Sequence, residues 1–316
     1  MTVKYVAFPT KRAYGVELEL SSNGISKSEI ASAIANVDSK SRSVNVMGWG
    51  YSDNNKDWHV KEDSSCGWEV ASYKSRGVKD LLNIGNVTNA IKTVGGRVTY
   101  RCGFHLHVEV SDFSQSEVAT LVAIWMKVEN VIINMVPSHR ANNKYCRLLN
   151  DYHEKVKSKE FTTPLKFWQA IKPNLSGHFN KQRRVALNIW NYAANDDRQT
   201  VEFRFPEGTL DARDVQNWIR LLVRLVDFSK KYPFPEDIKE VGLTETLRLI
   251  GLSGSSDFFL LSNGLRNTKE WFLYRIVKYS RNKKLCRDAV DELNRMWAPI
   301  KIYGLSPDHE VFYESI

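Results

Sequence analysis

The sequence of 316 residues lacks the features that mark several specialised classes of protein. Its 4 cysteines are too few and too widely spaced for a disulfide framework or a paired CxxC zinc site. Its 17 glycines and 9 prolines are too few for a disordered or fibrous chain. It contains no internal repeat and no low-complexity segment. These absences predict an ordinary globular protein, and the scarcity of cysteine fits a reducing cytoplasm.

Long hydrophobic runs are also lacking. The longest near-continuous apolar run, Val118–Met126, is far shorter than the roughly 20 residues that a membrane-spanning helix needs. The first residues, MTVKYVAFPTKR, contain no apolar signal core. We therefore expect no membrane association and a cytoplasmic location.

The excess of positive charge is mild. Lys and Arg number 45 against 36 Asp and Glu, which gives a net charge of +9. The densest basic groups, KQRR at 181–184 and RNKK at 281–284, accompany no nucleic-acid-binding motif, so we interpret them as solvated surface. The alternative is a non-catalytic basic protein whose DNA binding would depend strongly on salt.

The spacing of apolar residues predicts short strands mixed with helices up to residue 232 and helices alone after it. The predicted strands are Tyr14–Leu20, Trp58–Lys61, Trp68–Ser72, Phe104–Val110, Val185–Trp190 and Thr200–Phe205. The predicted helices are Lys27–Asn36 with Ser26 as N-cap, Val78–Val94, Ser114–Val136 stopped by Pro137, Asp211–Tyr232, Glu245–Ile250, Thr268–Tyr279 and Leu285–Trp297. Residues 40–56 and 195–197 are expected to be loop and turn. Because strand and helix do not alternate regularly, the order favours an α+β fold with an antiparallel sheet.

Four of these strands carry acids and imidazoles opposite their apolar residues. Side chains alternate along a strand, so residues two apart share a face. The polar residues concerned are Glu17 and Glu19, Glu69, His105 and His107, and Glu202 with Arg204. One such face is usually just solvated, but four faces rich in carboxylate and imidazole offer the ligands that Mg²⁺ and Mn²⁺ use. If the strands are neighbours, a divalent cation would relieve the repulsion between the carboxylates.

Three arginines form a second set, at the ends or on the polar faces of the predicted elements. They are Arg147, Arg184 and Arg204, and each one alone could be a surface residue. Arginine beside a carboxylate-lined metal site suits phosphoryl transfer, although no GxxxxGK[ST] loop and no kinase signature is present. The alternative enzyme is a metal-dependent hydrolase with one zinc ion on His105 and His107, which would not need these arginines.

Five motifs in order resemble the amidoligase family, which comprises carboxylate–amine ligases of bacteria and phages with a glutamine-synthetase-like catalytic fold. The motifs are GVELEL, WHVKEDSSCGWEVAS, CGFHLHVEV, RLLN and TVEFRFPEGTLDARDVQNWI, between about Tyr14 and Leu225. Two departures stand out. Asp63-Ser64-Ser65 replaces the usual Asp-Gly-Ser of the hairpin, and Tyr73 stands where the family often has proline.

The resemblance implies a curved antiparallel sheet with helices packed on one face, in a catalytic domain over residues 1–232. Residues 233–316 have no counterpart and would form a helical C-terminal extension. The implied activity is ATP-dependent amide formation through an acyl phosphate, with two Mg²⁺ or Mn²⁺ ions. The partners would be a small-molecule or peptide carboxylate and an amine, in the host cytoplasm if a phage encodes the protein.

The resemblance also assigns roles to the residues of both sets. The implied metal ligands are Glu17, Glu19, Glu69, His105 and Glu202. His105, Arg184 and Arg204 would contact the nucleotide. Arg147, Arg184 and Arg204 would bind phosphate or the substrate carboxylate during catalysis, with His107 beside them.

Overall fold

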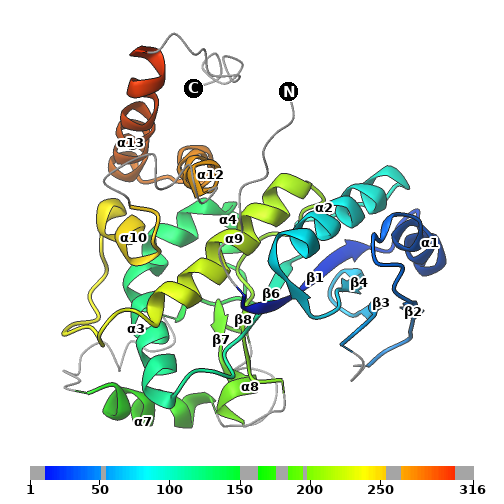
Figure 1. The fold of residues 1–316 in the computed structure, drawn as a ribbon, viewed down its shortest axis with the longest axis horizontal. Coiled ribbons are helices and arrows are strands. Elements are labelled where there is room, and N and C mark those ends of the chain that lie inside the picture. Colours follow the sequence, from blue (N-terminus) through cyan, green and yellow to red (C-terminus); the bar gives the residue numbers. More distant parts are fainter. Residues whose placement is uncertain are drawn as a thin grey trace.

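The computed structural model describes residues 11–50, 55–149, 163–175, 184–194, 198–253 and 265–302. These residues form an α+β fold with one open sheet of eight strands, and α2 and α9 lie over β1 and β6 (Figure 1). The strands are β1 (Ala13–Ser21), β2 (Val44–Val46), β3 (Trp58–Asp63), β4 (Gly67–Ala71), β5 (Ser75–Arg76), β6 (Phe104–Glu109), β7 (Leu187–Asn188) and β8 (Thr200–Phe203). Their order is β2-β3-β4-β1-β6-β8-β7, and β5 pairs with the start of β1.

Helices cover the apolar face of this sheet, as expected. The helices of the described residues are α1 (Lys27–Val37), α2 (Gly77–Thr93), α3 (Gln115–Ile132) with a 3₁₀ turn (Ile133–Met135), α4 (Ser138–Ala141), α7 (Pro164–Leu175), α8 (Trp190–Ala193), α9 (Ala212–Ser229), α10 (Leu243–Leu249), α12 (Leu265–Tyr279) and α13 (Lys283–Ile302). Ser26 caps α1 in a reciprocal capping box with Glu29, which confirms the predicted start of that helix. The sequence prediction missed α4 and α7, although Pro164 in the first turn of α7 is a helix-start signal.

Two predicted segments differ from the structure. Residues 44–46 lie in a predicted loop but form β2, which pairs parallel with β3 and makes the sheet mixed rather than antiparallel throughout. The predicted strand Val185–Trp190 shrinks to the two residues of β7, because the Asn188 side chain accepts a hydrogen bond from the Trp190 amide (2.9 Å) and turns the chain into α8. The predicted turn at 195–197 lies outside the described residues.

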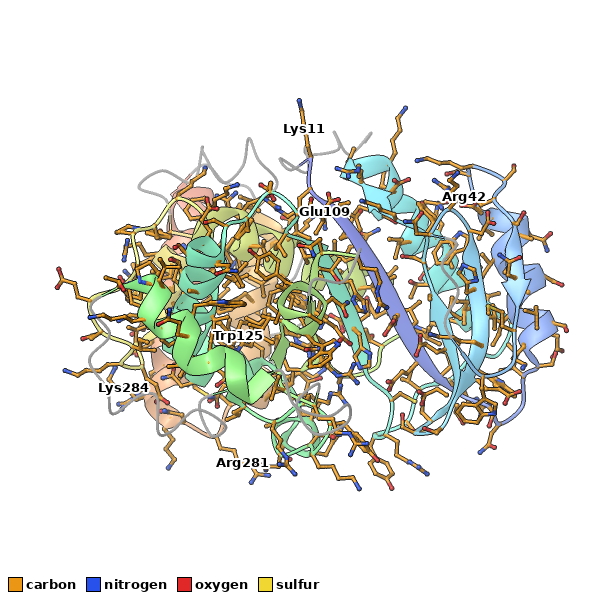
Figure 2. The ribbon with its side chains drawn as sticks, turned by 90° about the horizontal axis from the view of Figure 1, so that it is seen from below. Lys11, Arg42, Glu109, Trp125, Arg281 and Lys284 are labelled. Carbon is orange, nitrogen blue, oxygen red and sulfur yellow. The ribbon has the colours of Figure 1, made fainter. Side chains whose placement is uncertain are left out.

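Aromatic rings join α3 and α9 to the end of β8. The ring of Trp125 lies 5.4 Å from Phe203 and 5.3 Å from Phe205, and Phe205 lies 5.1 Å from Trp218 on α9. Figure 2 shows Trp125 within the helical half of the molecule. The segment Gln115–Met135 is long and apolar enough to cross a membrane, but 78% of its most apolar window is buried inside the protein, as in a core helix.

The helices after residue 232 pack on the preceding part of the chain. The Arg275 guanidinium on α12 donates to the Met135 carbonyl (2.8 Å) and pairs with Glu207 and Asp214. Thr268 donates to the Asn217 side chain of α9 (2.9 Å). The division of the chain at residue 232, and a separate role for 233–316, stay predictions.

Candidate active site

The strand register brings the polar faces of β4, β1, β6 and β8 side by side. Glu17 on β1 lies opposite His105 on β6, and Glu19 lies opposite Glu69 on β4. His107 lies opposite Glu202 on β8. Glu17 and His105 therefore share one face of the sheet, as their alternation predicted.

A cavity of about 280 Å³ opens over this face. It is lined by Glu17, Glu19, Asp63, Ser64, Ser65, Arg101, His105, His107, Arg140, Tyr145, Arg184, Asn191, Arg198, Glu202 and Arg204. The hairpin of residues 63–65, where the chain departs from the usual family sequence, thus forms part of the wall.

Three side chains in the cavity converge like the ligands of a metal ion. One donor atom each from Glu17, His107 and Glu202 lie within 4.8 Å of one another. His107 Nε2 is buried and lies 3.3 Å from Glu17 Oε1 and 3.9 Å from Glu202 Oε1, without the geometry of a hydrogen bond. A buried imidazole nitrogen facing two carboxylates suits a divalent cation, so these residues fit such a group.

His105 has carboxylates at both ring nitrogens. Its Nδ1 lies 3.1 Å from Glu17 Oε2 and 3.7 Å from Glu202 Oε1, and its Nε2 lies 3.4 Å from Glu19 Oε1. A neutral imidazole can donate from only one nitrogen, so a cation beside the other nitrogen would suit this arrangement. The backbone amide of Gly103 donates to Glu19 Oε2 (2.5 Å) and fixes that carboxylate beside His105.

Mutual charge shifts the pKa values in this cluster. Burial raises the pKa of Glu17, but the charge of His107 and the hydrogen bond from His105 outweigh it and hold that pKa well below its usual range. Burial also raises the pKa of Glu202, but the charges of Arg204 and His107 outweigh burial and lower that pKa. Burial disfavours the charged form of His107, yet Glu17 and Glu202 raise its pKa. The cluster therefore keeps its carboxylates ionised by holding positive charge between them.

Glu69 differs from the other predicted metal ligands. Its Oε1 lies 2.8 Å from the Lys61 ammonium on β3, and it is not among the residues that line the cavity. Burial and the nearby charge of Glu17 raise its pKa to about 8, against the opposing effect of Lys61. The sequence prediction missed Lys61, although the hairpin register places it directly opposite Glu69. A metal-binding role for Glu69 stays a prediction.

The three predicted arginines occupy different places. Arg204 forms an ion pair with Glu202 and lines the cavity. Arg184 also lines it, with its guanidinium 4.7 Å from the centre of the Tyr145 ring. Arg147 is exposed and does not line the cavity, but its backbone amide donates to the Arg184 carbonyl (3.0 Å).

Arg140 is a cavity residue that the sequence did not reveal. It is 2% exposed, and its guanidinium donates to the Phe205 carbonyl (3.2 Å) and the Arg204 carbonyl (2.5 Å). It thereby holds the end of β8 in place. Its position depends on contacts 64 and 65 residues away, so no local pattern marks it. The neighbouring glycine is the one available signal, because a Cβ on Gly103 would lie 2.5 Å from Arg140 Nη2.

The fold and the cavity define an α+β protein whose sheet carries a carboxylate, imidazole and arginine site. A family model described as "putative amidoligase enzyme" matches residues 10–226 of this chain. The chain therefore belongs to this amidoligase family, whose name indicates an enzyme of the ligase type. A comparison with curated proteins found no match.

Proposed function

We propose that the protein is an ATP-dependent carboxylate–amine ligase that forms an amide bond through an acyl phosphate. The observation that carries this proposal is the set of side chains that line the first cavity. Its convergent donors from Glu17, His107 and Glu202 lie beside the guanidinium of Arg204, and Arg184 lines the same space. Acids alone would suit metal-assisted hydrolysis, but the added arginines suit a reaction in which phosphate charge must be held.

The chemistry requires activation of the acid. A carboxylate is a poor electrophile at neutral pH because its negative charge repels an amine. In the first step a carboxylate oxygen attacks the γ-phosphorus of ATP, and the bond to ADP breaks. In the second step the amine nitrogen attacks the acyl carbon, the carbon–oxygen bond breaks, inorganic phosphate leaves and the nitrogen loses a proton.

Glu17, His107 and Glu202 would hold a divalent ion, Mg²⁺ or Mn²⁺, with His105 and Glu19 adjacent as ligands of a second one. When bound, such ions neutralise phosphate oxygens and align the phosphoryl group. Glu69, which the sequence also predicts as a metal ligand, pairs with Lys61 in the structure.

The chain's own cations would orient the anionic substrates. Arg204 is held from both sides, because its side chain pairs with Glu202 and its carbonyl accepts from Arg140. A guanidinium fixed in this way presents a planar fork to a phosphate or carboxylate without first having to be ordered. Arg184 rests on Tyr145 and would contact a second anionic group of the same substrates.

An oxygen-18 transfer experiment tests the proposal. The protein is incubated with ATP, Mg²⁺, an amine and a panel of acids labelled in the carboxylate. We expect ADP release that needs the acid, and one labelled oxygen in the phosphate released after the amine attacks. Unlabelled phosphate would exclude the acyl phosphate. Zinc-dependent hydrolysis without ATP consumption would instead support the hydrolase built on His105 and His107.

A further inference from the structure

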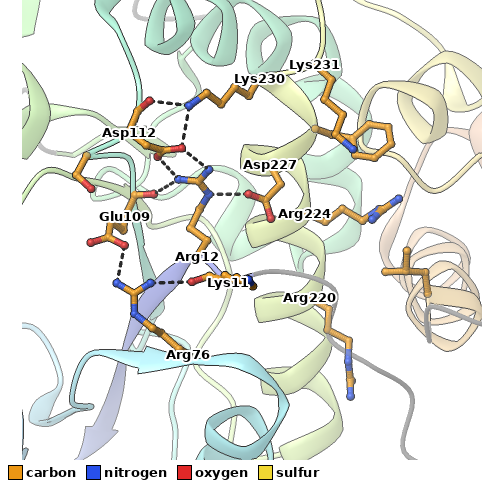
Figure 3. A pocket seen from close by; sticks show the side chains of 13 residues that line it. Lys11, Arg12, Arg76, Glu109, Asp112, Arg220, Arg224, Asp227, Lys230 and Lys231 are labelled. Carbon is orange, nitrogen blue, oxygen red and sulfur yellow. Dashed lines mark hydrogen bonds and ion pairs between the residues drawn. The ribbon is translucent and has the colours of Figure 1, made fainter.

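A second and larger cavity, of about 520 Å³, lies between the start of β1, the end of β6 and helix α9 (Figure 3). It shares no lining residue with the first cavity. Seven cationic and three acidic side chains line it. They are Lys11, Arg12, Arg76, Arg220, Arg224, Lys230 and Lys231, with Glu109, Asp112 and Asp227.

Every acid of this cavity is already neutralised by a neighbouring cation. The nitrogen–oxygen pairs are Arg12 with Asp112 (2.6 Å), Arg12 with Asp227 (2.7 Å), Lys230 with Asp112 (2.8 Å) and Arg76 with Glu109 (2.9 Å). Figure 3 shows these pairs as dashed lines between the labelled side chains. No acid is therefore left to balance the other cations.

Four cations of the cavity have no carboxylate partner within ion-pair distance among the described residues: Lys11, Arg220, Arg224 and Lys231. In Figure 3 the side chains of Arg220 and Arg224 project from α9 without a dashed line to any acid. Arg224 donates to the Gly251 carbonyl (2.9 Å) and lies over the Phe228 ring.

Arg220 and Arg224 are four residues apart on α9, so they lie on the same side of the helix one turn apart. Like charges at this spacing destabilise a helix. Arg220 and Arg224 are both half-buried residues, and burial lowers the pKa of each guanidinium. Two partly desolvated cations that pair with no carboxylate of the described residues are unfavourable, and an anion in the cavity would relieve that cost.

We propose that this cavity binds a small soluble polyanion that carries two or more phosphate groups. The guanidinium forks of Arg220 and Arg224 would each grip phosphate oxygens, while Lys11 and Lys231 supply further positive charge at the edge. The volume fits a ligand of the size of a nucleotide rather than a single ion. The site shares no lining residue with the first cavity, so this proposal does not depend on the proposed function.

Calorimetric titration with pyrophosphate, in metal-free buffer at low salt, tests the proposal on the full chain. We expect saturable binding to the wild type. In Arg220→Gln the affinity should fall about tenfold or more, and in Arg220→Gln/Arg224→Gln further, because each change removes a charge-assisted contact. Arg213→Gln is the matched control, since Arg213 is exposed on the same helix and does not line the cavity. Its affinity should match that of the wild type within about twofold.

Three further arms make the result decisive. Arg184→Gln, in the first cavity, should keep the pyrophosphate binding that Arg220→Gln weakens; loss of binding in Arg184→Gln together with wild-type binding in Arg220→Gln would place the site in the first cavity and overturn the proposal. Without pyrophosphate, Arg220→Gln should unfold at the same temperature as the wild type or higher, whereas a lower temperature would assign Arg220 a structural role. Vesicles with phosphoinositide headgroups and duplex DNA are tested as alternative ligands. The proposal would also be overturned if either bound far more tightly than pyrophosphate and lost affinity equally in Arg213→Gln.

Discussion

The two cavities lie beside the same strands, β1 and β6, yet their charges are arranged in different ways. In the first cavity, the carboxylates of Glu17, Glu19 and Glu202 lie around the imidazoles of His105 and His107. In the cavity beside α9, each acid is paired and the cations Arg220 and Arg224 are left over. Crowded carboxylates and unpaired cations are each unfavourable without a partner, which is why we propose a metal ion for the first cavity and a polyanion for the second.

The sharpest test of the first cavity is Glu202→Gln. The substitution keeps the shape and removes the negative charge shared by His107 and Arg204, so ATP-dependent turnover should fall by about 10³-fold or more. Turnover is measured as ADP release in the presence of acid and amine. Glu62→Gln is the control, because Glu62 pairs with Lys27 and lines neither cavity. Full activity of Glu202→Gln in a folded protein would contradict the metal-binding assignment.

Arg204→Lys should have the next largest effect, a loss of about 10²-fold in turnover. Lysine keeps the charge beside Glu202 but lacks the planar fork that can hold two phosphate oxygens at once. Steady-state kinetics should show the loss mainly in kcat if Arg204 stabilises the developing phosphate charge. A rise in KM alone would instead assign Arg204 to ground-state binding.

The strand-borne part of the first cavity could be predicted from the sequence because a strand has a fixed period of two. Once Glu17 and Glu19 alternate with Val16, Leu18 and Leu20, their side chains must share a face opposite the core. The period of two does not show that they converge with His107 and Glu202, because that depends on which strands are neighbours in the sheet. The ordered family motifs supplied that expectation.

The remaining features depend on contacts that no local pattern encodes. Arg140 reaches the end of β8 from the short helix α4, and the unpaired state of Arg220 and Arg224 emerges only when the pairing of every nearby acid is known. Lys61 could have been found by aligning the two strands of the hairpin around residues 63–67. The strand β2 was missed because three residues in a polar stretch carry too little alternation to be recognised.

Gly103→Ala tests the first cavity alone, because Gly103 lies beside two of its lining residues, Arg140 and His105. The added Cβ would lie 2.5 Å from Arg140 Nη2 and 3.0 Å from His105 Nε2. Arg140 cannot easily move, because it is buried and hydrogen-bonded to two carbonyls. We expect unfolding by denaturant to show a loss of about 1–3 kcal/mol. Gly48→Ala is the control, since a Cβ there meets nothing within 4 Å; equal losses in both variants would contradict the crowding argument.

Asp80 provides the balanced case against which both cavities can be compared, and Asp80→Asn should have the smallest effect. Its carboxylate is buried and accepts hydrogen bonds from the Tyr73 hydroxyl (3.0 Å) and the Arg76 amide (2.8 Å), and Lys40 lies 2.5 Å away.

Burial raises the pKa of Asp80, but these partners outweigh burial and lower it. A lowered folded-state pKa adds stability above the unfolded value of about 3.9, and that stability is lost as pH falls through the folded-state pKa. The free energies of unfolding of wild type and Asp80→Asn should therefore differ by about 1–2 kcal/mol at pH 7, after solvent screening, and the difference should shrink as the pH falls below about 4. A difference that stayed constant down to pH 2 would show that the Asp80 charge contributes nothing to stability.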